Sequence, residues 1–140
     1  MKRLWKRNRK GKEKGQSMTE VALVLPVMLL ILAGILDLGR LYYVTVALTD
    51  AAGEGAVYAA IRPNSADEII ARTQAASTGL VQIDMEKVTV DCPSLVAGQP
   101  VTVTVDYDFT VATPLINAFV PDGVIKLRGV ASEPIVTGEM

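Results

Sequence analysis

A long uncharged apolar stretch lies near the start of the chain, and helical patterning extends well beyond it. Residues 21–36 read VALVLPVMLLILAGIL, and the helical pattern continues to about Ile61, just before Pro63. At about 1.5 Å per residue, sixteen residues fall slightly short of a bilayer, so uncharged flanking residues are needed to complete the crossing. The pattern predicts a helix that spans a membrane and continues outside it.

A cleaved secretory signal is the competing interpretation, because its apolar core is also short. Such a signal ends in a small-residue cleavage site soon after the core. Here the chain runs on as DLGRLYY at 37–43 in helical pattern, which favours a retained anchor. Pro26, inside the span, lacks the N–H for one helical hydrogen bond and predicts a bend.

The residues that follow the apolar run suit a membrane boundary. Tyr42 and Tyr43 lie where interfacial aromatic residues are found. Asp37 and Arg40, three positions apart around Gly39, can meet on one helix face and so lower the cost of charges near the boundary. An ordinary turn of a helix leaving the membrane also accounts for this arrangement.

Small residues recur every four positions in the distal part of this helix. One row is Ala47, Ala51, Gly55 and Ala59, and Ala52, Ala56 and Ala60 form a second row beside it. Together they predict a smooth face on which another backbone can approach closely. The partner is either a neighbouring subunit or the chain's own sheet, and both could hold along different lengths.

The rest of the chain predicts one short helix followed by three strands. Ser65-Ala66-Asp67-Glu68 is typical of a capping box, with Gly79 as the expected helix stop. The period then changes to two, which predicts strands at 87–92, 101–111 and 124–131. The alternation indicates an antiparallel sheet with one wet face and one face buried beneath the helices.

These elements predict an α+β fold, in which the long N-terminal helix packs on a small three-stranded antiparallel sheet beside one short helix. We divide the chain into a leader at 1–15, a membrane-spanning and extended helix at 16–62, and an extracytoplasmic domain at 63–140. An apolar segment at 114–120 either tucks under the sheet, which we favour, or docks on a partner or the membrane.

Charge is distributed unevenly. Residues 1–14 carry eight lysines and arginines against Glu13, a net of +7, whereas the rest of the chain carries −8 and the whole chain −1. A basic head could bind nucleic acid, but this one directly abuts an apolar span, where basic residues mark the cytoplasmic side. We therefore expect a disordered cytoplasmic leader and no nucleic-acid partner.

Little in the composition indicates catalysis or metal binding. The chain has no histidine, which removes the commonest general base and metal ligand, and no nucleophile or phosphate-loop motif. Asp106 and Asp108, with Asp91 opposite, could hold calcium, but solvated strand charges are far more common. Cys92 is the only cysteine and reads as a small buried hydrophobe, with an intermolecular disulfide as the alternative. We expect no enzyme activity, cofactor, metal or small-molecule substrate.

The junction GQSMTEV at 15–21 carries the most specific signal. A basic leader stops at Gly15, and Glu20 stands at the edge of the apolar segment, where a carboxylate is costly unless something offsets it. Glycine presents no side chain to a protease cleft. Cleavage after it would expose an ammonium on Gln16, which Glu20 could neutralise in its own subunit or across to a neighbour. At about 4 Å and an effective dielectric near 20, that attraction is roughly 4 kcal/mol before desolvation.

This layout resembles the opening of TadE-like proteins, the pseudopilins of tight-adherence (Flp-type) pilus systems. The likeness runs from Gly15 to about Ala60, through Pro26, the acidic–Gly–Arg element at 37–40 and the Ala-rich element at 51–56. It implies processing by a prepilin peptidase and a minor part in building or exporting a surface fibre. Flp major pilins are much shorter, which argues against the bulk subunit.

The resemblance predicts a single-pass protein of the bacterial inner membrane with its N-terminus in the cytoplasm. Its expected partners are the lipid bilayer, the prepilin peptidase, other pilins or pseudopilins and Tad secretion components. The alternative is an uncleaved single-span protein whose sheet binds an envelope ligand. Loss of residues 1–15 from the native protein would distinguish the two.

Overall fold

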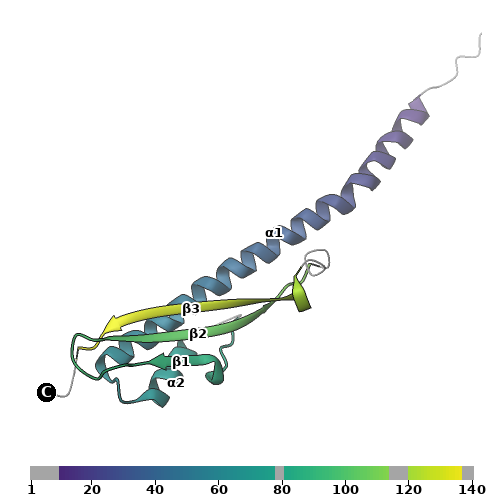
Figure 1. Cartoon of the computed structure of the whole chain (residues 1–140). Coiled ribbons are helices and arrows are strands. Elements are labelled where there is room, and N and C mark those ends of the chain that lie inside the picture. The colour runs from purple at the N-terminus through teal and green to yellow at the C-terminus, as the bar shows by residue number, and fades with distance from the viewer. Residues whose placement is uncertain (1–9, 78–80, 114–119, 137–140) are drawn as a thin grey trace, which may run out of the picture.

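A computed structural model shows a long helix with a small α+β domain at its C-terminal end (Figure 1). It describes residues 10–77, 81–113 and 120–136 of the 140-residue chain, and side chains from Gln16 onward. The expected helix stop at Gly79 and most of the apolar segment at 114–120 lie outside the described residues. The helices and strands are α1 (Lys10–Ile61), α2 (Ala66–Ala76), β1 (Val88–Asp91), β2 (Pro100–Thr110) and β3 (Val124–Pro134), with short 3-10 turns at Met85–Lys87 and Pro121–Gly123.

Helix α1 is continuous over 52 residues and passes through Pro26. Its end at Ile61 agrees with the sequence prediction, because Pro63 cannot continue the helix. The start at Lys10 corrects the expectation that the whole leader is disordered. Lysine, glutamate and glutamine are good helix formers, and the apolar helix beyond them already supplies the costly nucleus.

Helix α2 begins after Ser65 as predicted, but the capping box does not form. The Ser65 side chain makes no capping hydrogen bond. Glu68, expected to reach back to Ser65, instead accepts a hydrogen bond from the Tyr58 hydroxyl on α1. It also pairs with Arg62 at 3.4 Å. Contacts of Glu68 with Tyr58 on α1 and with Arg62 just after it therefore replaced the local cap.

The three strands form an antiparallel sheet in the order β1-β2-β3. The first two strands lie within one residue of their predicted limits, whereas β3 extends three residues further than the pattern indicated. Its extension follows from pairing along the whole of β2, from Thr110 opposite Val124 to Pro100 opposite Pro134. Backbone pairing continues there although the apolar alternation has faded.

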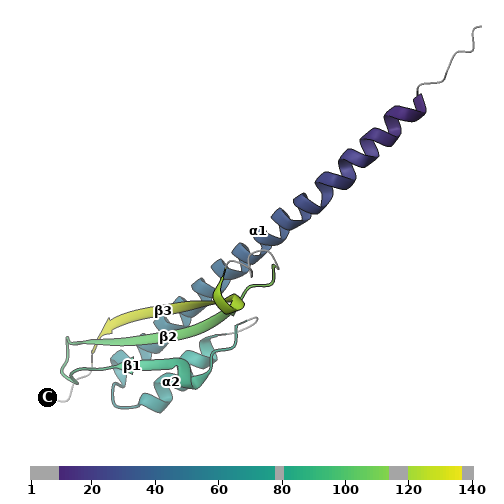
Figure 2. The same cartoon turned by 45° about the vertical axis from the view of Figure 1, so that its right-hand side comes forward.

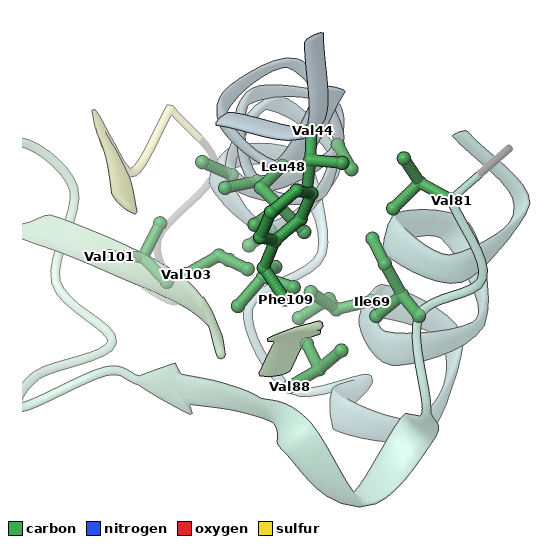
Figure 3. Packing of buried hydrophobic residues seen from close by; sticks show 14 of the residues in the cluster. Val44, Leu48, Ile69, Val81, Val88, Val101, Val103 and Phe109 are labelled. Atoms are coloured by element: carbon green, nitrogen blue, oxygen red, sulfur yellow. The ribbon is translucent and has the colours of Figure 1, made fainter. Parts of the chain in front are cut away.

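The core lies between one face of the sheet and the two helices that cover it (Figure 3). The predicted inward face of β2 is confirmed, since Val101, Val103 and Val105 are fully buried and Phe109 is nearly so. The other large members come from α1, α2, β1 and the segment before β1: Val44, Leu48, Ile69, Val81, Ile83 and Val88. The sheet thus has one buried and one wet face.

The backbones of α1 and β3 approach each other closely at one glycine. A β-carbon on Gly129 would lie 2.5 Å from the backbone carbonyl of Leu48, where no real atom fits. The far end of the domain is tied by hydrogen bonds, with Val136 N–H donating to the carbonyl of Ala60 at 2.8 Å. These contacts hold the distal half of α1 against the sheet.

Candidate functional site

The leader end of α1 stands clear of the domain, as both views of the molecule show (Figures 1 and 2). Gln16 and Glu20 are both exposed, and their spacing of four places them on the same face of the helix. Glu20 has no ion-pair partner among the side chains that the structure describes. Gly15 lies within the helical backbone, where glycine is about 1 kcal/mol less favourable than alanine. The glycine therefore lowers the cost of opening the helix at the predicted cut.

The apolar part of α1 is exposed on nearly every side. Leu23, Met28 and Leu38 are 75%, 63% and 65% exposed. Within the described residues, α1 is the one helix long and apolar enough to cross a membrane. Since such a surface is costly in water, the chain is a single-pass membrane protein.

Where this helix meets the domain, Asp37 is buried and bonded to the end of the sheet. Its carboxylate accepts hydrogen bonds from the Thr113 hydroxyl at 2.6 Å and the Thr113 N–H at 2.7 Å. The N–H of Ala112 lies 3.4 Å from its other oxygen. The side chain of Asp37 is thus a clasp between α1 and the residues that follow β2. This long-range contact was not predicted.

Arg40 completes the junction from the solvent side. Its guanidinium pairs with Asp37 at 3.4 Å, as the spacing predicted, but the Arg40 side chain remains 56% exposed. It also lies over the ring of Phe109, 5.2 Å from the centroid, in a cation–π contact. The Phe109 ring is thus buried in the core and also orients the Arg40 guanidinium at this end of the domain. Gly39, on the preceding position, has open space where a β-carbon would project.

The small-residue face packs inside the domain. Ala51 and Ala59 are fully buried, Gly55 is buried, and Ala47 is half-buried. A β-carbon on Gly55 would lie 2.1 Å from the Thr73 hydroxyl of α2, which itself bonds the carbonyl of Ile69. Of the two partners that the sequence left open, the chain's own α2 and sheet occupy this face. The tiny side chains let α2 and β2 approach the α1 backbone.

The wet face of the sheet carries paired charges. Asp106 accepts a hydrogen bond from Arg128 at 2.7 Å, and Asp108 pairs with Lys87. The hydrogen bond from Lys87 lowers the pKa of Asp108 and raises that of Lys87. Both carboxylates are thus neutralised by cations on neighbouring elements.

The hypothetical calcium arrangement was wrong in its geometry. Asp91 pairs with Thr102, so the strand register places it four residues along β2 from Asp106. No group of three metal-ligating side chains occurs among the described residues. Cys92 is half-buried beside the core, and its thiol lies 3.5 Å from the carbonyl of Ser94. The thiol is free.

Several important residues gave no recognisable signal in the sequence. Thr113 lies 76 positions from Asp37, and nothing local to either residue points to the other. In the sequence, Gly129 was only a small residue within the strand whose alternation pattern was weakest. The alternating pattern of β2 predicted that Phe109 is buried, but it did not predict that Arg40 lies over its ring. Only the assembled domain brings these groups together.

Comparison with known proteins bears on about a third of the chain, near its N-terminus. Residues 15–57 match the family model described as TadE-like protein. No curated protein and no solved structure gives a significant match. The matched segment begins at Gly15 and includes the apolar helix, the Asp37–Arg40 pair and most of the small-residue face. The resemblance to TadE-like proteins is therefore confirmed over residues 15–57.

Proposed function

We propose that this chain is a minor pilin-like membrane protein that a prepilin peptidase cuts after Gly15 and that helps to assemble or export a Tad-type adhesive pilus. The observation that carries the proposal is the family match, because it starts at the proposed cut and follows the helix out of the membrane. In this role the N-terminus lies in the cytoplasm and the domain outside the bacterial inner membrane. We infer no catalytic role.

The local physics of the leader supports processing at this position. A protease needs an extended backbone in its cleft, so the helix must open locally at the cut. Gly11 and Gly15 lower the cost of that opening, by about 1 kcal/mol each relative to alanine. The basic residues before Gly15 hold that end at the cytoplasmic face. Gln16 would then become the new N-terminus.

The exposed helix supports an assembly role. Most of its apolar side chains are exposed in the monomer, so lipid or helices of other pilus components must surround them. Glu20 lies at the cytoplasmic edge of that surface without a described ion-pair partner. An ammonium on Gln16, in the same or a neighbouring subunit, would offset its charge.

The intact mass of the protein purified from its native membrane tests the proposal. Loss of residues 1–15, with Gln16 as the first residue, is the expected result. A full-length chain in cells that contain an active prepilin peptidase would overturn the processing assignment. It would favour the alternative of an uncleaved anchor that carries an envelope-binding domain.

A further inference from the structure

A groove lies between α1 and the membrane-side end of β2. Strand β1 pairs with β2 only from Thr102 to Val105, so it does not cover the following residues of β2 on that side. The groove has a volume of about 640 Å³. Its α1 wall consists of Ile35, Leu36, Gly39, Arg40, Tyr43 and Val44, and its β2 wall of Tyr107, Asp108, Phe109 and Thr110.

One part of the groove is lined by residues of the apolar run of α1, which we place in the membrane. Ile35 and Leu36 are the last residues of the apolar run and are 58% and 62% exposed. If residues 16–36 cross the bilayer, their length of about 30 Å matches the hydrocarbon thickness. Arg40 then lies about one helical turn beyond it, at the depth of lipid headgroups. Gly39 leaves the wall open between these two levels.

The lining of the groove also carries two opposite charges. The Arg40 guanidinium is oriented by Asp37 and by the Phe109 ring, yet more than half of the side chain is exposed. The Asp108 side chain is 49% exposed and pairs through one oxygen with Lys87, outside the groove. Arg40 and Asp108 are the only charged residues among the described lining.

We propose that this groove binds one zwitterionic phospholipid, with phosphatidylethanolamine as the fitting class. The phosphate pairs with Arg40, the ammonium faces Asp108, and one acyl chain lies along Ile35 and Leu36. A lipid with a net negative headgroup would pair with Arg40 but would offer no ammonium to the Asp108 oxygen that Lys87 does not contact. The site depends on the membrane location of α1 and not on any role in a pilus.

Native mass spectrometry of the full chain, extracted in mild detergent from bilayers of equal phosphatidylethanolamine and phosphatidylglycerol, tests the site. We expect one retained lipid, predominantly phosphatidylethanolamine. Arg40→Gln should lower retention about tenfold, because it removes a charge-assisted hydrogen bond. Arg72→Gln is the matched control, since Arg72 is equally exposed and pairs with Glu54 far from the groove. Asp108→Asn should shift retention toward phosphatidylglycerol.

A second pair of variants separates lipid loss from misfolding. Gly39→Leu fills the groove without removing a charge, whereas Gly53→Leu adds the same bulk on α1 where nothing lies within 4 Å. Only Gly39→Leu should abolish retention, and neither variant should unfold at a lower temperature than the wild-type chain. Equal retention of the two lipids by the wild-type chain, or equal effects of the paired variants, would overturn the proposal. Displacement of the lipid by millimolar inorganic phosphate would also overturn it, because the site would then recognise phosphate alone.

Discussion

The carboxylate of Asp37 and the hydroxyl of Thr113 lie 2.6 Å apart although 76 residues separate them along the chain. The bond joins α1, just after its apolar run, to the residues that follow β2. A buried carboxylate is tolerable only when it is well bonded, and here the Thr113 N–H and Arg40 also contribute. This clasp sets where the domain sits along the helix.

Removal of the Thr113 hydroxyl should therefore destabilise the domain. We expect Thr113→Val to lower the free energy of unfolding by roughly 1–3 kcal/mol, because a buried carboxylate loses a donor. Thermal unfolding in detergent, followed by circular dichroism, measures the change. Thr104→Val, on the wet face of β2, is the control and should change stability little. Equal effects of the two variants would show that the clasp contributes nothing specific.

The two glycines of α1 at positions 53 and 55 should respond oppositely to alanine. Gly53→Ala should stabilise the chain by about 0.5–1 kcal/mol, because its β-carbon meets nothing and alanine favours helix. Gly55→Ala should destabilise it by about 1–3 kcal/mol, since its β-carbon would lie 2.1 Å from the Thr73 hydroxyl. Adding Thr73→Ala should recover part of the loss. Chemical denaturation of the three variants checks the signs, and a stable Gly55→Ala would contradict this packing.

A methyl group on Gly129 should be costlier than one on Gly55. The atoms that a β-carbon would meet belong to the backbone of Leu48, at 2.5 Å, and a helix backbone cannot move aside as a side chain can. We expect Gly129→Ala to separate α1 from β3, with a larger drop in melting temperature than Gly55→Ala causes. Hydrogen exchange of the α1 and β3 amides would locate the loss. Val130→Ala, on the exposed face of the same strand, serves as the control.

Substitution at the proposed cut should block processing without blocking insertion. Gly15→Leu places a bulky side chain at the scissile bond, while the basic head and apolar span stay intact. In cells with an active prepilin peptidase we expect full-length protein in the membrane fraction on immunoblots. Gly11→Leu, a leader glycine away from the cut, should be processed normally. Mature-sized Gly15→Leu protein would refute cleavage at this site.

Glu20 should matter after cleavage rather than during it. We expect Glu20→Ala to be cut normally but to recover fewer partner pilins or pseudopilins when it is purified from detergent. The reason is that the ammonium of Gln16 loses its neutralising carboxylate, and Glu20→Gln should behave like Glu20→Ala if charge is the cause. Recovery is compared at equal expression. Undiminished partner recovery from both variants would mean that Glu20 is not an assembly contact.

The sequence by itself determined the elements whose causes are local. A run of apolar residues must avoid water, Pro63 must end a helix, and alternating valines and threonines must form a strand with two unlike faces. The membrane helix, the α+β class and the inward face of β2 therefore followed from pattern alone. The TadE-like resemblance likewise depended on the order and spacing of residues within one continuous segment.

Only the tertiary structure decided which of these surfaces meet. The small-residue face could have packed on another subunit, but the fit of Gly55 against Thr73 assigns it to the chain's own core. The strand register places Asp91 four residues along β2 from Asp106. Glu68 bonds the Tyr58 hydroxyl instead of forming the capping box with Ser65. The bond between Asp37 and Thr113 depends on a contact across 76 residues. Such contacts form because packing of the core brings together groups that are far apart in the chain. Local preferences for helix, strand or turn do not specify which distant residues will meet.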